Sequence, residues 1–375
     1  MSLELWTLAI ATATALACAL CGVLLVVRRE ALVAEGLSHA VLPGIVVGFV
    51  LLQERNAPLL IGAAALAGLL MVLAVQLLRR TGIVDPDASL GIVFSALFSV
   101  GILVASQRLR NTHFHAHCII DGDLALAALD DVSVGGTVIG PRAFYILLAV
   151  LAVLGTFLAL MWKELQMMLF DPGLARSFGL RPGLLHAAWL GLVSLTAVAA
   201  FDTAGSILVV ALMIAPAAAA YLLARSLFQM VWIACGIGAA SAAAGFGLGM
   251  GLDMTPSAPM ASSAGLAFLV VFLLAPREGV VARLRVRRAQ RAELRRQLLL
   301  HGVGSAGCAE SELAGALRWS AAQCRQEIDR AVASGHVECV GERVCVTLAG
   351  QAHGRAYLAR MLGGSAGRAP DPVAS

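Results

Sequence analysis

Charged residues are scarce in this 375-residue chain: Asp, Glu, Lys and Arg make up 13% of it, and aromatic residues only 6%. Soluble globular domains carry about 25% charge, so this composition excludes an ordinary soluble protein. Hydrophobic residues reach 59%, and nine stretches of 18 to 27 residues contain no charged residue. Because a helix of about 20 apolar residues spans a bilayer, the sequence predicts a polytopic membrane protein. It excludes enzymes that need a large soluble catalytic domain.

Lysine is almost absent as well. The single lysine, Lys163, follows Ala-Leu-Met-Trp, so the chain contains no GxxxxGK[ST] loop for binding nucleotide phosphates. We therefore expect no enzymatic activity and no permanently bound cofactor. If the protein works by ATP hydrolysis, a separate subunit has to supply the ATPase.

The charge-free stretches predict an all-α membrane domain of eight to nine transmembrane helices over residues 1–276. The lower number remains open because the second stretch is short and is bounded by Glu35. Basic residues follow alternate stretches, and the positive-inside rule assigns those loops to the cytoplasm. This places the N-terminus outside and the C-terminal part inside. The stretches are 5–27, 36–53, 56–78, 88–107, 143–162, 182–201, 203–224, 226–252 and 254–276.

Two ionisable residues stand at the second stretch. Glu35 and His39 are four residues apart and would share one face of a helix. Because ionisable residues in a spanning helix are costly, they usually face a cavity or a partner, and this pair of donors suits Mn, Fe or Zn. A structural alternative is that Glu35 pairs with the nearby arginines and His39 binds a carbonyl. Pro43-Gly44 is expected to break the helix and expose carbonyls.

The segment Lys163–Gly183 predicts a short helix in a cytoplasmic loop. Asp171 is a typical N-cap, Pro172 suits the first helical position, and Gly179 suits the end. Leu174, Phe178 and Leu180 would then be exposed apolar residues in need of a partner. Such a helix could instead lie on the membrane surface.

Histidines gather between the fourth and fifth stretches. His113, His115 and His117 alternate, so an extended strand would place all three on one face. This arrangement on the outer side suggests a site that collects metal. The alternative is a solvated loop without ligand.

The region after residue 276 divides into three parts. Residues 277–296 hold eight Arg and two Glu, which predicts a basic juxtamembrane linker helix. Residues 297–362 hold balanced charge and read as helix, helix-turn-helix, hairpin and helix, which is a small α+β winged-helix pattern. Residues 363–375 are rich in Gly, Ala, Pro and Ser and are expected to be disordered.

The residues described so far resemble the metal-importing permease family of ABC transporters, of the manganese, zinc and iron type. The resemblance covers about 270 residues in the right order. The motifs that carry it are Arg28-Arg29 with Glu35-Gly-Leu-Ser-His-Ala-Val-Leu-Pro-Gly44, Phe170-Asp171-Pro-x-x-Ala175 with Gly179-Leu180, Gly205-Ser-Ile-Leu-Val-Val-Ala-Leu-Met-Ile-Ala-Pro216, and Pro256-Ser257 with Pro276.

This resemblance implies a function in the bacterial cell (inner) membrane. Glu35 and His39 would lie in the pathway of a transported divalent metal ion, with Glu at 35 where several members carry Asp. The segment from Asp171 to Leu180 would be the coupling helix that inserts into a cytoplasmic ATP-binding cassette ATPase. The other implied partners are an external metal-binding protein and a second permease subunit, identical or homologous.

The tail resembles the winged-helix part of diphtheria-toxin-repressor-like metal regulators, through Gly335-His-Val-Glu and Val346-Thr-Leu-Ala-Gly350. It stops before the domain that holds the metal ligands of those repressors. The expected recognition helix, 320–334, balances Arg325 and Arg330 against Glu327 and Asp329, whereas DNA readers carry a basic face. We therefore do not expect DNA binding.

Three functions remain to be compared. The favoured one is the permease subunit of an ATP-driven importer of divalent transition metal. A membrane-tethered, metal-responsive transcriptional regulator is the alternative, and the balanced charge of 297–375 disfavours it. A proton-coupled carrier would require more carboxylates within the spans.

Overall fold

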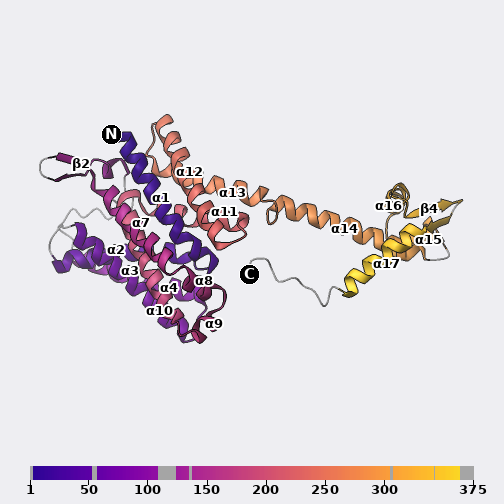
Figure 1. Ribbon diagram of the computed structural model, residues 1–375, viewed down its shortest axis with the longest axis horizontal. Helices are drawn as coiled ribbons and strands as arrows, with labels where there is room; N and C mark the ends of the chain where they lie inside the picture. Colours follow the sequence, from indigo (N-terminus) through magenta and orange to yellow (C-terminus); the bar gives the residue numbers. More distant parts are fainter. Residues whose placement is uncertain are drawn as a thin grey trace. The chain divides into compact units, whose positions relative to one another are not determined.

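The computed structural model of the protein describes residues 3–52, 57–108, 124–134, 137–304, 307–341 and 343–363. The chain divides into two compact units, Met1–Ala275 and Pro276–Ser375 (Figure 1). This boundary lies one residue from the end of the predicted membrane domain. Each unit has its own hydrophobic core.

The first unit is a bundle of long apolar helices. Nine helices among the described residues are long and apolar enough to cross a membrane, which agrees with the upper end of the predicted range. In chain order its elements are α1 (Leu3–Val27), α2 (Leu32–Leu52), α3 (Ala57–Arg80), α4 (Pro86–Arg108), α6 (Leu124–Ala127), β1 (Asp131–Val134), β2 (Thr137–Pro141), α7 (Arg142–Leu160), α8 (Trp162–Phe170), α9 (Pro172–Ser177), α10 (Pro182–Ala204), α11 (Ser206–Leu223), α12 (Leu227–Gly251) and α13 (Ser257–Leu274).

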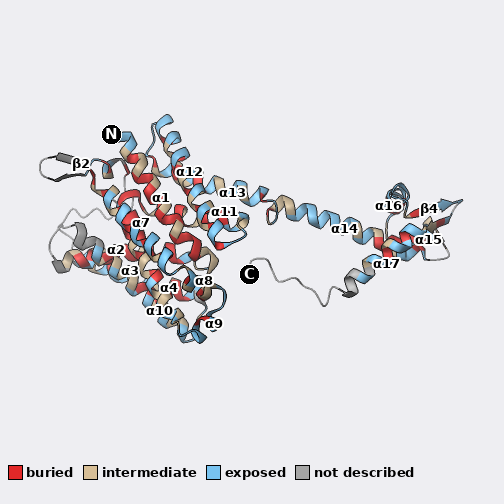
Figure 2. Cartoon of the chain, in the orientation of Figure 1, coloured by how far each residue is buried: buried red, intermediate tan, exposed pale blue. Residues whose placement is uncertain are grey.

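Helix α1 lies at the centre of this bundle. It packs against α7, α10, α11 and α12, and the buried residues of the unit concentrate along it (Figure 2). Small residues permit this packing: a Cβ added at Gly22 would overlap the backbone carbonyl of Met213 on α11. Because lipid is as apolar as leucine, close packing of this kind holds membrane helices together.

Helix α2 differs from the prediction in its continuity. It begins at Leu32, so Glu35 lies within its first turn. It also continues through Pro43 to Leu52, so the expected break at Pro43-Gly44 is wrong. Gly101 of α4 packs directly on Pro43, and α3 packs equally closely on Gly44. Neighbouring helices can thus hold a proline-containing membrane helix in place.

A strand pair interrupts the all-α architecture before α7. Strands β1 and β2 are antiparallel, with Asp131 opposite Pro141 and Val134 opposite Thr137. The prediction of an all-α membrane domain is therefore wrong in this detail. The pair ends against α1, because the ring of Trp6 occupies the space that a Cβ at Gly140 would need.

The described part of the second unit contains four helices and a three-stranded antiparallel sheet in the order β3-β5-β4. Its core is formed by residues such as Leu299, Leu313, Ile328 and Val344. The boundary expected at residue 296 falls inside α14. The described elements are α14 (Val280–Val303), β3 (Cys308–Ala309), α15 (Glu310–Leu317), α16 (Ala321–Ala333), β4 (Val337–Val340), β5 (Arg343–Val346) and α17 (Leu348–Gly363). The segment expected to be disordered lies outside the described residues, apart from Gly363.

Candidate functional site

Glu35 and His39 lie one turn apart on the continuous helix α2, as their spacing predicts. Glu35 is exposed and His39 is half-buried. The imidazole of His39 stacks on the ring of Phe94 at a centroid distance of 5.1 Å and an interplanar angle of 17°. Phe98 meets the same ring edge-on at 5.6 Å. Phe94 and Phe98 of α4 therefore fix the orientation of the His39 imidazole.

Sequence reasoning missed Phe94 and Phe98. Their four-residue spacing on α4 was a signal, because it places both rings on one helix face. Nothing in the local pattern indicated that this face meets His39, since α4 is apolar all round. That contact depends on how α2 and α4 pack.

The described residues contain no complete cluster of metal-binding side chains. Within the described ranges, no three His, Cys, Asp or Glu side chains cluster closely enough to hold a metal ion. Glu35 and His39 could provide two donors. The predicted outer site of His113, His115 and His117 lies outside the described residues.

The segment between α7 and α10 forms two short helices. Asp171 caps α9 as predicted, because its Oδ1 accepts a hydrogen bond of 2.8 Å from the backbone N–H of Leu174. Pro172 occupies the start of the helix, and Gly179 ends the turn with φ of +79°. Helix α8, which directly precedes this cap, was not predicted.

Three apolar residues of this segment form an exposed surface, called here the apolar patch: Phe170, Leu174 and Phe178. Their exposed fractions are 49%, 46% and 67%. Ala175 is fully buried and anchors α9 beneath them. Leu180 is only half-buried, so it does not match the prediction of an exposed residue. Large apolar side chains held on a rigid turn are suited to insertion into a cleft of a partner protein.

A buried carboxylate, Glu30, connects three parts of the bundle. It lies between α1 and α2, with its side chain only 10% exposed. Arg79, at the end of α3, donates a hydrogen bond of 3.2 Å to Oε1 of Glu30. His186 of α10 brings Nε2 within 3.3 Å of Oε2, and Nε of Arg28 lies 3.6 Å from the same oxygen. No local sequence pattern predicted this cluster.

The surroundings of Glu30 favour its ionised form. Burial raises the pKa of the carboxyl group. The hydrogen bond and charge of His186, together with the charges of Arg28 and Arg79, lower this pKa by more than burial raises it. The net pKa lies below the ordinary value of 4.5. A buried carboxylate with several partners of this kind holds helices in a defined register.

Comparison with known proteins agrees with this architecture. The sequence pattern of the ABC 3 transport family matches residues 2–275. The chain is 36% identical over 357 residues to the zinc transport system membrane protein TroD of Treponema pallidum, covering 93% of this chain and 97% of that one. It is also 36% identical over 283 residues to the manganese transport system membrane protein MntD of Bacillus subtilis, covering 76% and 96%. The match to TroD therefore extends into the second unit.

The fold is similar to that of a solved structure, PsaBC from Streptococcus pneumoniae in complex with Fab. The TM-score is 0.61 at 24% sequence identity, over 74% of this chain and 94% of that one. An inward-facing conformation of a putative metal-chelate type ABC transporter matches with a TM-score of 0.52 at 14% identity, over 71% and 84%. The resemblance deduced from Glu35-Gly-Leu-Ser-His39 and Phe170-Asp171-Pro172 is thus confirmed at the level of the family. With its helical bundle and a family match that spans the whole first unit, the chain belongs to the ABC 3 transport family of membrane permeases.

Proposed function

We propose that this protein is the membrane-spanning permease subunit of an ATP-driven importer of a divalent transition metal ion, Mn, Zn or Fe. The observation that carries the proposal is the placement of Glu35 and His39 on one face of α2, with the imidazole held by Phe94 and Phe98. A carboxylate and an imidazole are suitable ligands for these metals. The names of the relatives specify zinc for TroD, manganese for MntD, and chelated iron for the transport system membrane protein YfeC of Yersinia pestis.

In this proposal the metal is a transient substrate. Two donors bind a cation weakly, which suits a pathway because an ion must also leave. A second permease subunit, identical or homologous, would bring its own donors to complete the coordination. An external metal-binding protein would deliver the ion. The exposure of Glu35 in a single chain is consistent with a surface that meets such a partner.

We further propose that the end of the bundle containing Glu30 faces the cytoplasm. Arg28, Arg79, Arg80 and Arg181 lie at that end, as the positive-inside rule requires. The apolar patch of Phe170, Leu174 and Phe178 would dock into a separate ATP-binding cassette ATPase. Since the chain has one lysine and no phosphate-binding loop, that partner would perform all ATP hydrolysis.

The Glu30 cluster offers a route from the ATPase to the metal pathway. Helix α9 contacts α10, and His186 lies in the first turns of α10. Glu30 contacts His186 and stands immediately before α2, which carries Glu35 and His39. A movement of α9, the docking segment, would therefore be transmitted to Glu35 and His39 through the contact between His186 and Glu30.

For the second unit, we propose a cytoplasmic winged-helix module with a regulatory or partner-binding role. Support comes from the order of its elements and from its sheet order, β3-β5-β4. The two arginines of α16 form ion pairs within the second unit. Arg325 pairs with Glu310 at 3.3 Å, and Arg330 pairs with Glu327 at 2.9 Å. Arginines engaged in this way are poorly placed to bind DNA phosphates.

The proposal is tested by uptake of radiolabelled Mn²⁺ and Zn²⁺ in cells that contain the complete transporter. His39→Ala and Glu35→Ala should each abolish uptake while expression and assembly remain normal. Ser38→Ala is the matched control, because the Ser38 hydroxyl donates a hydrogen bond to the Glu35 carbonyl 2.6 Å away and supplies neither a carboxylate nor an imidazole. Normal uptake by both variants at the two donors would refute the proposal.

A further inference from the structure

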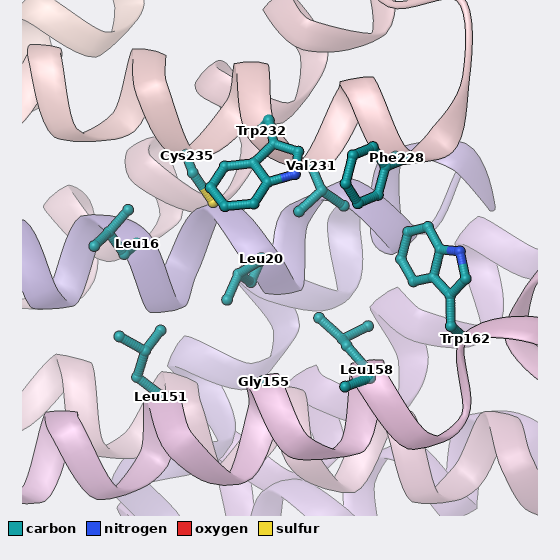
Figure 3. A pocket seen from close by; sticks show the side chains of 11 residues that line it. Leu16, Leu20, Leu151, Gly155, Leu158, Trp162, Phe228, Val231, Trp232 and Cys235 are labelled. Atoms are coloured by element: carbon teal, nitrogen blue, oxygen red, sulfur yellow. The ribbon is translucent and has the colours of Figure 1, made fainter.

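An apolar groove runs along the first unit between α7 and α12, with α1 as its floor. Its volume is about 590 Å³. Leu16 and Leu20 form the floor, and Figure 3 shows the side chains of α12 facing those of α7 across it. The remaining lining residues are Leu151, Gly155, Leu158, Ala159, Trp162, Phe228, Val231, Trp232 and Cys235. None of these described lining residues is charged.

One end of the groove is aromatic and the other is aliphatic. Trp162 and Phe228 meet edge-on at a centroid distance of 6.2 Å, and Phe228 and Trp232 are equally far apart. In Figure 3 Trp162 and Phe228 lie at the end opposite Leu16 and Leu151. Tryptophan collects at the level of the lipid headgroups, so the aromatic end marks the membrane interface.

The length of the groove corresponds to one leaflet. Helix α7 lines it from Leu151 to Ala159, which is about 12 Å of helix, and Trp162 extends it further. Half of the hydrocarbon core of a bilayer measures about 15 Å. An acyl chain that enters at the aromatic end would thus reach the aliphatic end near the middle of the membrane.

Two cations flank the aromatic end. Lys163 directly follows Trp162, and Arg225 lies just before α12, where its backbone N–H donates to the side chain of Gln229 at 3.2 Å. Both side chains are exposed, and within the part of the chain that the structure describes neither has a carboxylate partner. Each cation thus lies close in the chain to an aromatic residue of the groove, Lys163 next to Trp162 and Arg225 three residues before Phe228.

We propose that this groove is a binding site for an anionic phospholipid, with one acyl chain between α7 and α12 and its phosphate near Lys163 and Arg225. The apolar lining, the length of one leaflet and the paired cations at the mouth together select this occupant. A neutral lipid would use only the apolar part.

Gly155 provides a clean way to fill the site. A Cβ added there meets no atom within 4 Å, so a leucine can enter the groove without moving the backbone. Gly265 on α13 is equally open and does not line the groove, which makes Gly265→Leu the matched control. For the charges, Lys163→Gln/Arg225→Gln is compared with Arg285→Gln/Arg288→Gln, two exposed arginines of α14.

The experiment uses the purified full chain in phosphatidylcholine vesicles that contain a small fraction of brominated phosphatidylglycerol or brominated phosphatidylcholine. Bromine quenches the fluorescence of nearby tryptophans, and Trp162 and Trp232 line the groove. We expect brominated phosphatidylglycerol to compete at least about fivefold better, the factor given by one cation near a membrane surface. Trp162→Phe and Trp232→Phe should each remove part of this selective quenching.

Gly155→Leu should reduce the selective quenching, and Lys163→Gln/Arg225→Gln should abolish the preference for phosphatidylglycerol, while both controls behave as the unmodified chain. Equal quenching by the two brominated lipids would overturn the proposal, as would unchanged quenching in Gly155→Leu. The assay needs neither metal nor ATPase, so its result is independent of the transport function proposed above.

Discussion

The carboxylate of Glu30 and the imidazole of His186 lie 3.3 Å apart and join the turn before α2 to the first part of α10. Arg79 contacts the other oxygen of the same carboxylate. Three helices therefore share one buried charge. In the proposed transport function this contact would couple α10, which follows α9, to α2, which carries Glu35 and His39.

Removing the charge of Glu30 should destabilise the protein and change its response to pH. Loss of one partner from a buried ion pair costs about 3 kcal/mol, so Glu30→Gln should lower the thermal unfolding temperature at pH 7. Because the folded-state pKa of Glu30 lies below its ordinary value of 4.5, the contribution is complete above that value and is lost as the pH falls below it. The difference between the two proteins should therefore shrink in acid.

The matched control for this measurement is Glu278→Gln. Glu278 forms an exposed pair with Arg283 at 3.5 Å, and exposed pairs contribute less than about 1 kcal/mol. An equal loss of stability in both variants, or a difference for Glu30→Gln that does not change with pH, would contradict the role assigned to Glu30.

Phe94→Ala should impair metal uptake without removing a metal donor. The stack of Phe94 on His39 orients the imidazole, and groups that orient a metal-binding histidine typically change metal affinity by about 10- to 100-fold. We expect the concentration of Mn²⁺ or Zn²⁺ needed for half-maximal uptake to rise about tenfold or more. Phe94→Tyr keeps the ring and should restore most of the uptake.

Phe268→Ala serves as the control for Phe94, because Phe268 stacks on Phe272 of the same helix at 5.8 Å, away from α2. If both alanine variants transported with unchanged affinity, the aromatic support of His39 would have no functional role.

Phe178→Asp should weaken docking of the ATPase. Phe178 is 67% exposed, and a charge placed there would have to be desolvated in any apolar cleft of a partner. Burial of a large apolar anchor contributes about 2 kcal/mol or more to binding, so co-purification of the ATPase should fall at least about tenfold. The measurement is the amount of ATPase retained on the tagged permease.

Ile83→Asp is a suitable comparison for Phe178→Asp, since Ile83 is 85% exposed in the turn between α3 and α4 and lies outside the apolar patch. Wild-type retention and transport by Phe178→Asp would show that the patch does not bind the ATPase.

The second unit should not bind DNA specifically. Arg325 and Arg330 are paired with Glu310 and Glu327, so few free cations remain on α16 to release counterions from phosphates. The purified full chain should give no saturable binding to its own promoter DNA near physiological salt. A specific complex at nanomolar concentration that Arg325→Ala abolishes would instead support a membrane-tethered regulator.

The sequence by itself determined the membrane domain and much of its local structure. Apolar runs long enough to cross a bilayer leave a chain no alternative to spanning helices, since every backbone polar group must be satisfied internally. Local chemistry was equally decisive at Asp171, whose side chain can bond a backbone N–H three residues away whatever the surroundings. The spacing of Glu35 and His39 likewise fixed their shared face once α2 was helical.

Only the tertiary structure decided which residues meet across helices. Glu30 with Arg79 and His186, and His39 with Phe94, are contacts between distant segments. Membrane helices that are apolar on every side carry no periodic pattern to indicate which face packs inward. The continuity of α2 through Pro43 depended in the same way on Gly101 of α4. Close packing between particular helix faces supplied this information, and a local sequence pattern does not encode it.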